Sequence, residues 1–208
     1  MTENILTIKN LSKKFKDNEV VKNVSLEVEK GQIIGIIGRN GSGKTVLLKM
    51  IIGLYIPTTG SIDYHGYKVI DDYGVLVDTG FLDGETGFNN LKLLAILKNK
   101  INDQKIYDIM KYVKLDPTNE TKYKNYSTGM KQKLKLAQAL MEEPEILILD
   151  EPFNGMDKES VLFFRNCLLE LKAKGKTILI TSHYQEDIDA LCDRVYEMVD
   201  GELKPYEK

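Results

Sequence analysis

The sequence predicts an α/β fold with a mostly parallel sheet, an antiparallel β layer at one edge and an inserted α-helical subdomain. Three runs of consecutive apolar residues, at 33–37, 146–149 and 177–181, are typical of strands that are buried on both faces of a sheet. Helical patterns separate these runs, and strands that alternate with helices form parallel sheets. The stretch from about 88 to 143 contains helical segments and no strand candidate.

The antiparallel layer is predicted from alternating apolar and polar residues near the N-terminus. This alternation is present at Ile5–Ile8 and at Val24–Val28. Further short β-like runs between 61 and 77 are broken by Gly66 and Gly74, and we expect them in the same layer.

Helices are predicted where apolar residues recur every three or four positions. One pattern covers 46–51, directly after the first apolar run, and another covers 161–169 and stops near Gly175. In the helical subdomain, a pattern at 106–113 follows Asn102, whose side chain suits a helix N-cap.

Length and composition limit the function classes. The chain has 208 residues, of which 42% are hydrophobic, and can bury one core with a smaller lobe. Lys and Arg number 29 against 31 Asp and Glu, so 29 − 31 = −2, which argues against nucleic acid as a partner. We expect one domain over 1–208, with the antiparallel layer and core at about 1–77 and 144–208 and the helical subdomain at about 78–143.

Cysteine usage and hydropathy favour a cytoplasmic location. Cys167 and Cys192 are isolated, so neither a zinc site nor a disulfide framework is predicted. The N-terminus lacks a signal-peptide pattern, and charged residues interrupt the apolar stretches well short of about 18 residues. We therefore expect a chain that does not itself span a membrane.

Residues 38–45 read GRNGSGKT, which fits the phosphate-loop pattern GxxxxGK[ST] and lies between a strand and a helix, as that motif requires. Its glycines let backbone N–H groups curl around phosphate oxygens, Lys44 can reach the β- and γ-phosphates, and Thr45 can offer its hydroxyl to Mg²⁺. The motif predicts a phosphate-loop NTPase core, with a Gly-rich structural turn as the alternative. The residues expected to bind nucleotide here are Gly38, Asn40, Gly41, Ser42, Gly43, Lys44 and Thr45.

A GTPase is a weaker interpretation of the same loop. Asp71–Gly74 matches the DxxG pattern of GTPases. The NKxD pattern that begins at Asn99 is not completed, because Asn102 stands where the pattern requires aspartate.

Two carboxylates follow the second apolar run, where residues 146–152 read ILILDEP. At the carboxyl end of a buried strand, Asp150 can hold Mg²⁺ through water and Glu151 can face the γ-phosphate. Glu151 is the candidate that polarises the attacking water, either as general base or as orienter. The alternative is a surface acid pair that caps a helix.

Residues 126–132 read YSTGMKQ and precede apolar residues at helical spacing, so Ser127 and Gly129 are predicted at the start of a helix. Such a helix end can bind anions. Taken alone, the segment would be an ordinary helix cap.

In order and spacing, these motifs resemble those of an ABC ATPase over essentially the whole chain. YSTGMKQ is similar to the family signature LSGGQ, and 150 − 127 = 23 residues separate Ser127 from Asp150. The FNGMD and SHYQE segments complete the series. The resemblance implies that Ser127 and Gly129 bind the γ-phosphate that the opposite subunit holds.

The resemblance also implies roles for single residues in other segments. Asp157 in FNGMD resembles the residue of the loop that crosses the dimer interface, and His183 the switch histidine that contacts the γ-phosphate. Phe15 resembles the aromatic residue that stacks on adenine, for which a flat π face suffices, and a core phenylalanine is the alternative. Glu151, His183 and Lys44 would form the catalytic group.

The sequence departs from the family at Asp78, where most members have a glutamine that ligands Mg²⁺. An aspartate can still coordinate Mg²⁺, so Thr45, Asp78 and Asp150 are the candidate metal ligands, but its charge and shorter reach would alter the metal's surroundings and slow hydrolysis. An acidic residue here, with TGFNNL at 86–91, resembles the branch that exports bacitracin and lantibiotic peptides.

The resemblance implies the ATP-binding and hydrolysing subunit of an ABC transporter, with ATP and Mg²⁺ as cofactors. It would form a homodimer or pair with a close relative, and drive a separate integral membrane permease from the inner face of the cell membrane, with export as the expected direction. Two rivals share the nucleotide motifs. One is a soluble ABC-type ATPase of a cytosolic assembly system, and the other is a nucleotide-responsive module without hydrolysis, which Asp78 favours.

Overall fold

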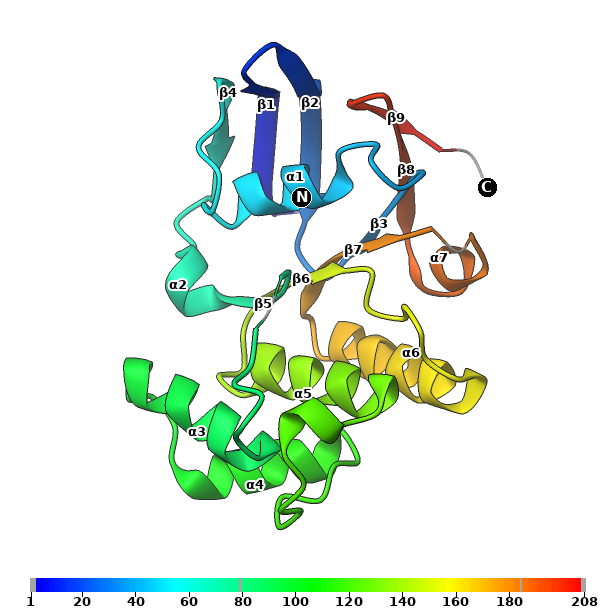
Figure 1. Cartoon of the computed structure of the whole chain (residues 1–208). Coiled ribbons are helices and arrows are strands. Elements are labelled where there is room, and N and C mark those ends of the chain that lie inside the picture. The colour runs from blue at the N-terminus through cyan, green and yellow to red at the C-terminus, as the bar shows by residue number, and fades with distance from the viewer. Residues whose placement is uncertain (1–2, 79, 184, 207–208) are drawn as a thin grey trace.

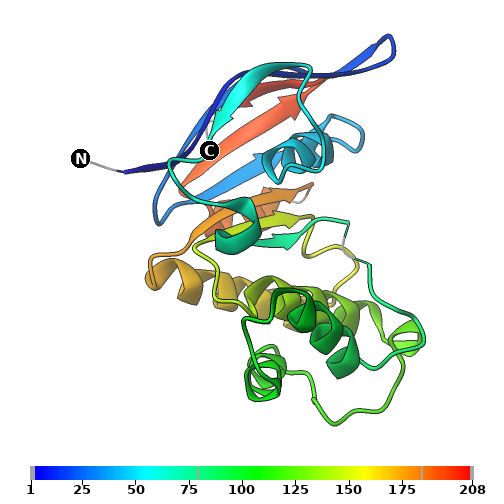
Figure 2. The same ribbon diagram turned by 90° about the vertical axis from the view of Figure 1, so that its left-hand side faces the viewer.

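Three layers stack in the computed structural model, which describes residues 3–78, 80–183 and 185–206 (Figure 1). An antiparallel sheet forms the layer at the top of the view, a mostly parallel sheet lies in the middle, and helices cover its lower face. One helix, α1 (Lys44–Ile51), lies between the two sheets (Figure 2). The predicted α/β fold is confirmed.

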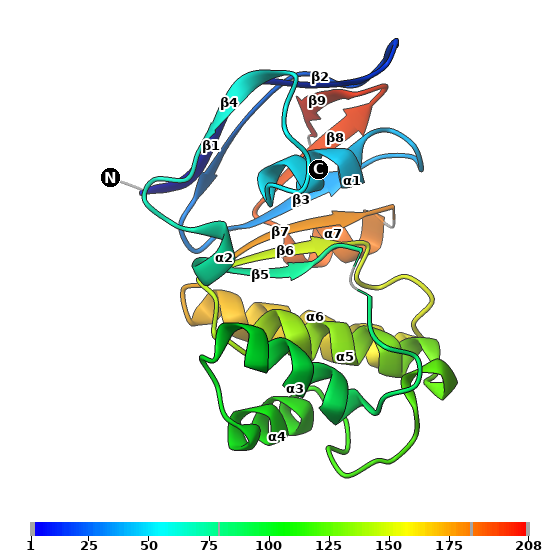
Figure 3. The ribbon, with the colours of Figure 1, turned by 60° about the vertical axis from the view of Figure 1, so that its left-hand side comes forward.

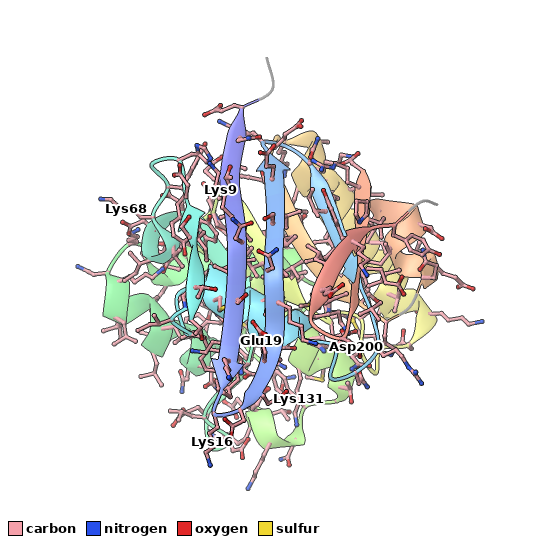
Figure 4. The ribbon with its side chains drawn as sticks, turned by 90° about the horizontal axis from the view of Figure 1, so that it is seen from above. Lys9, Lys16, Glu19, Lys68, Lys131 and Asp200 are labelled. Atoms are coloured by element: carbon pink, nitrogen blue, oxygen red, sulfur yellow. The ribbon has the colours of Figure 1, made fainter. Side chains whose placement is uncertain are left out.

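The antiparallel sheet contains β1 (Asn4–Phe15), β2 (Asn18–Glu29) and β4 (Thr59–Asp63), in the order β2-β1-β4. Along β2 the residues from Val24 to Val28 alternate between buried and exposed, as predicted. Aliphatic side chains of this sheet pack onto α1, whereas its outer face, seen from above in Figure 4, is polar and carries the exposed Lys9 and Glu19.

The second sheet has six strands in the order β5-β6-β7-β3-β8-β9, of which the first five are parallel. The three apolar runs form its central strands and are almost entirely buried, which confirms their prediction. The β9 strand pairs with β8 antiparallel at one edge. The strands are β3 (Ile33–Ile37), β5 (Tyr73–Leu76), β6 (Ile146–Asp150), β7 (Thr177–Ser182), β8 (Arg194–Val199) and β9 (Glu202–Pro205).

Two hydrophobic clusters hold this sheet, one on each face. Ile34 and Ile36 of β3 pack into the cluster with α1 and the antiparallel sheet, whereas Ile33 and Ile37 pack into the cluster with the lower helices. This division follows from the period of two in a strand, because successive side chains point to opposite faces. Burial on both faces fixes the position of the strand ends.

The helices other than α1 lie outside the two sheets, and several begin and end where the sequence predicts. Asn102 caps α4 by accepting a hydrogen bond from Lys105 N at 3.0 Å, and α6 ends just before Gly175. None of the helices in the described part of the chain is long and apolar enough to cross a membrane. The helices are α2 (Val69–Asp72), α3 (Gly87–Lys98), α4 (Asp103–Tyr112), the 3₁₀ turn η1 (Tyr123–Asn125), α5 (Thr128–Leu140), α6 (Lys158–Ala173) and α7 (Gln185–Leu191).

The predicted antiparallel layer is wrong for the end of the 61–77 segment. Here α2 follows the β4 strand, and β5 then enters the other sheet, where it pairs parallel with β6. Gly74 lies inside β5 and does not break it. A Cβ atom at Gly74 would lie 2.0 Å from the Ala139 carbonyl oxygen, so the glycine lets β5 lie directly against α5.

Gly74→Ala is therefore expected to destabilise the fold by overpacking, by about 1–3 kcal/mol of unfolding free energy. Urea denaturation of the full chain measures this change. The control is Gly84→Ala, because a Cβ atom there would meet nothing within 4 Å. Equal stability of the two variants would contradict the close approach of β5 and α5.

Candidate active site

The phosphate loop follows β3 and leads directly into α1, on the side of the parallel sheet where β3, β6 and β7 end (Figure 3). Gly38 has a φ of 152° and Gly43 a φ of 112°, both in the region that favours glycine. A Cβ atom at Gly38 would lie 2.4 Å from the Met198 carbonyl oxygen, and one at Gly43 would lie 2.7 Å from that of Val20. Larger residues would therefore force the loop away from β2 and β8.

Backbone hydrogen bonds tie the loop to the C-terminal hairpin. The Ser42 carbonyl accepts a bond from Gly201 N at 3.1 Å, and the Gly201 carbonyl accepts one from Lys22 N at 2.8 Å. The turn between β8 and β9 thus holds the phosphate loop against β2.

The Lys44 ammonium group is buried inside this loop, with only 5% of its side chain exposed. Its Nζ donates to the Gly38 carbonyl at 2.6 Å and lies 3.3 Å from both the Arg39 carbonyl oxygen and Glu151 Oε1. A buried cation requires such partners, because burial without them is very costly. Phosphate oxygens could take the place of these partners, and the buried ammonium would then still have negatively charged acceptors.

Ser42 provides a further observation that fits a bound phosphate. Its hydroxyl is buried and finds no hydrogen-bond partner among the residues that the structure describes. A buried hydroxyl in this state costs about 1–3 kcal/mol, which an acceptor such as a phosphate oxygen would offset. A hollow of about 150 Å³ beside the loop is lined by Asn40, Gly41, Gly43, Lys44, Thr45, Val46 and Glu151.

Asp150 lies at the carboxyl end of β6 and accepts two short hydrogen bonds from hydroxyl groups. Thr45 Oγ1 donates to its Oδ2 at 2.7 Å, and Thr181 Oγ1 donates to its Oδ1 at 2.6 Å. One carboxylate and one hydroxyl beside a phosphate site match the hard oxygen ligands that Mg²⁺ uses together with substrate phosphates. Thr45 and Asp150 therefore fit the predicted metal.

Glu151 connects the phosphate loop to His183. Its Oε2 accepts a hydrogen bond from His183 N at 3.2 Å and lies 2.7 Å from His183 Nδ1, while its Oε1 faces the Lys44 ammonium. Glu151 has a φ of 47°, a backbone conformation that is costly for a non-glycine residue. The structure thus places all three predicted catalytic side chains in one contiguous group.

Two helix starts, one predicted at Ser127 and one at Asp157, which the sequence predicts only as a dimer-interface residue, form a second group. Ser127 caps α5 by accepting from Met130 N at 3.2 Å, and Asp157 caps α6 by accepting from Ser160 N at 2.8 Å, a bond that lowers the pKa of Asp157. A Cβ atom at Gly129 would lie 3.6 Å from Ser160 Oγ, so the two starts adjoin. Within the described residues, no hydrogen bond of Ser127 or Asp157 reaches the phosphate loop.

Phe15 lies at the end of β1 with 40% of its surface exposed, so the alternative of a core phenylalanine is wrong. Its ring packs edge-to-face against Tyr55, with 5.4 Å between the ring centroids. The Lys13 ammonium lies 5.1 Å from the Phe15 ring centroid and donates a hydrogen bond to the Ile56 carbonyl. The Phe15 ring is thus packed against Tyr55 but remains accessible to solvent, which suits stacking on a base.

The Asp78 carboxylate contacts a lysine rather than the other predicted metal ligands. Its carboxylate forms an ion pair with Lys49 of α1, and this hydrogen bond raises the pKa of Lys49. Asp78 has a φ of 46° and 63% of its side chain is exposed. In the described part of the chain, Asp78 forms no hydrogen bond with Thr45 or Asp150.

The residues of the weaker GTPase interpretation take up other contacts. Asp71 lies in α2 and pairs with Lys100 at 2.5 Å, an interaction that lowers the pKa of Asp71 and raises that of Lys100. Asn99 is the C-cap of α3. Within the described residues, neither Asp71 nor Asn99 forms a hydrogen bond or ion pair with the phosphate loop.

Three residues of this region escape prediction from the sequence: Thr181, Lys49 and Tyr55. Thr181 has a usable signal, because it precedes His183 at the end of a buried strand, where side chains of neighbouring parallel strands meet. Its hydroxyl also accepts from Glu151 N at 3.0 Å, so it orients both carboxylate residues. Lys49 and Tyr55 give no such signal, since Asp78 and Phe15, which they contact, are distant in sequence.

Several known proteins are similar to this chain along most of its length. A family model described as ABC transporter matches residues 21–154. The chain is 42% identical to YybJ of Bacillus subtilis, an uncharacterized ABC transporter ATP-binding protein, over 98% of this chain and 97% of that protein. It is 37% identical to the bacitracin transport ATP-binding protein BcrA of Enterococcus faecalis, over 97% of this chain and 68% of that protein. The dimeric structure of MJ0796, a bacterial ABC transporter cassette, shares the fold with a TM-score of 0.89 at 24% identity, over 98% of both chains.

Thr181→Val removes the hydroxyl that orients Asp150 and Glu151 while it keeps the shape of the side chain. Loss of such a supporting hydrogen bond typically lowers metal affinity or activity by about 10- to 100-fold. We expect nucleotide hydrolysis to fall by that factor and to require more Mg²⁺, as steady-state assays across a Mg²⁺ titration would show. Thr181→Ser, which keeps the hydroxyl, should restore most of the rate, and equal loss in both variants would refute the orienting role.

Proposed function

Because the chain belongs to the ATP-binding proteins of ABC transporters, we propose that two copies of it, or one copy and a close relative, close around ATP to drive a separate membrane permease. As a member of this family the chain is a nucleotide-binding ATPase.

The observation that supports it most directly is the group formed by Lys44, Glu151 and His183. A cation that can grip a triphosphate, a carboxylate that can polarise water and a histidine that orients the carboxylate are all in contact. They lie at the carboxyl ends of parallel strands, where ligands of open α/β sheets bind. An acid pair that merely caps a helix would not require this group.

In the proposed reaction, the oxygen of a water molecule bonds to the γ-phosphorus of ATP while the bond from that phosphorus to the β–γ bridging oxygen breaks. ADP leaves, and the proton that the water gives up ends in the solution or on the released inorganic phosphate. Lys44 exchanges its carbonyl and carboxylate partners for phosphate oxygens, and the N-terminus of α1 adds the favourable field of its backbone dipoles. Thr45 and Asp150 would hold Mg²⁺, which when bound neutralises charge on the β- and γ-phosphates. Release from Lys44 leaves Glu151 to polarise the water, with His183 fixing its orientation.

A second copy of the chain would complete the site. Ser127, Gly129 and Asp157 form a group that is separate from the phosphate loop of their own protomer. In the proposal this group meets the γ-phosphate bound to the partner, so that neither copy alone has a complete site. The N-terminus of α5, with Ser127 as its cap, offers the backbone N–H groups for that contact.

The permease is proposed to dock on the segment from Asp78 to Asn90. Leu82 in this segment is 57% exposed, and Asn90 fixes its backbone through two hydrogen bonds, from Leu82 N at 2.7 Å and to the Leu82 carbonyl at 3.1 Å. An exposed leucine on a loop held by these hydrogen bonds could contribute to such a contact. Export is the proposed direction, because a relative from Burkholderia lata that is 34% identical over 94% of this chain is named as a Nod factor export ATP-binding protein.

Glu151→Gln should retain ATP binding but slow hydrolysis, because phosphate contacts remain while the water-polarising carboxylate is lost. The ATP-bound dimer would then accumulate. Size-exclusion chromatography with Mg²⁺ and ATP is expected to show a dimer for this variant and mostly monomer for the wild type. Monomer alone, for a variant that still binds ATP, would count against the sandwich.

Purification of the chain from its native host in detergent should recover a multi-spanning membrane protein with it. Leu82→Asp is expected to release that protein and to leave nucleotide affinity unchanged. The matched control is Leu169→Asp, an exposed leucine of α6. Recovery of a soluble assembly complex in place of a membrane protein would contradict the transporter role.

A further inference from the structure

Lys49 lies at a junction between three segments that are distant in sequence. It follows Lys44 on α1 by 49 − 44 = 5 residues, and its ammonium forms an ion pair with Asp78. The same ammonium lies 5.3 Å from the centroid of the Tyr55 ring, and the Lys49 carbonyl accepts a hydrogen bond from Tyr55 N at 3.0 Å. Tyr55 in turn supports Phe15.

We propose that Lys49 is a positioning residue that holds the Asp78 carboxylate at the edge of the nucleotide site and masks its charge until Mg²⁺ is present. The inference rests on the proposed nucleotide site, and it concerns a contact that the family resemblance does not supply. Its consequence is that Asp78 responds to the metal rather than forming a permanent part of the metal site.

Packing fixes the place from which Lys49 acts. Its helical neighbours are buried, so α1 cannot shift without disturbing the core between the two sheets. Lys49 itself has 17% of its side chain exposed, with the ring of Tyr55 on one side. An ammonium over an aromatic face is stabilised there, which restricts where the cation can go. Lys49 therefore offers Asp78 a fixed cationic partner on the same helix that begins with Lys44.

Asp78 is free to exchange this partner for another. It follows the buried Val77, but 63% of its own side chain is exposed. Solvent screens an ion pair whose carboxylate is largely exposed, so the pair contributes little to folding and structural need alone does not hold Asp78 beside α1. The carboxylate can therefore leave Lys49 when a stronger cation is close by.

The charges predict effects of opposite sign with and without metal. If Lys49 is removed, α1 loses a cation and the Asp78 carboxylate is unmasked, so a nucleotide that carries no metal is repelled. When Mg²⁺ is present, the same carboxylate can supply an oxygen ligand and improve binding. A purely structural lysine would change both affinities in the same direction.

The chain contains a matched ion pair that serves as a control. Lys92 pairs with Asp103 at 2.6 Å, and its ammonium lies 5.9 Å from the centroid of the Phe88 ring. The lysine, aspartate and aromatic ring are thus reproduced between α3 and α4, on elements that carry no part of the phosphate loop. Lys92→Met should leave nucleotide affinity unchanged.

The test is calorimetric titration of the full chain with ADP, once in EDTA and once in excess Mg²⁺. Lys49→Met is expected to weaken metal-free binding by roughly two- to fivefold, and to enlarge the gain in affinity that Mg²⁺ brings by a similar factor. In the Lys49→Met background, Asp78→Asn should restore metal-free binding and abolish the enlarged gain.

Additive effects of the two substitutions would overturn the proposal, because they would show that the residues act independently. The same shift in Lys92→Met would overturn it as well, since any exposed lysine would then suffice. Failure of the wild-type chain to bind ADP would remove the nucleotide site itself and with it this inference. If the chain binds ADP but the effects of Lys49→Met and Asp78→Asn on affinity are independent, the role of Lys49 is refuted and the proposed function still stands.

Discussion

A buried ammonium group needs compensating partners, and much of the structure follows from that need at Lys44. The carbonyl groups of the phosphate loop and the Glu151 carboxylate supply them. Both must reach the same point from segments that are over a hundred residues apart in sequence. The parallel sheet achieves this, because β3 and β6 end on one side and release the two segments there. The contact between the predicted catalytic side chains thus depends directly on the strand order.

The layers around the sheet keep that point fixed. Successive residues of β3, β6 and β7 pack alternately into the hydrophobic cluster above the sheet and the one below it. A shift of one residue in strand register would therefore move these side chains to the wrong faces of the sheet. Helix α1 is held between the two sheets, which anchors the phosphate loop at its C-terminal end. Contacts with α5 and α6 lie on the other side, where the second functional group begins.

Much of this arrangement can be predicted from the sequence, because strong local patterns coincide with buried strands and helix caps. The apolar runs, the Asn102 and Ser127 caps and the phosphate loop have local signals of this kind. The segment after β4 does not, because Gly74 serves a close contact with α5 that only the tertiary structure reveals. The pairing of Asp78 with Lys49 is hidden for the same reason, since neither residue has a motif that names the other. Residue types predict chemistry, whereas the choice between competing partners depends on packing.

The hydrogen bonds between Ser42, Gly201 and Lys22 have a consequence for synthesis of the chain on the ribosome. The nucleotide loop emerges early, but its backbone support at Gly201 emerges about 160 residues later, and β3 also lacks both of its neighbouring strands until then. Pairings of such long sequence separation form slowly. For most of its translation, a nascent chain would therefore contain the whole GRNGSGKT sequence without the strands and hydrogen bonds that hold the phosphate loop in place. Nucleotide could first help to stabilise the protein only when the β8–β9 turn has left the exit tunnel.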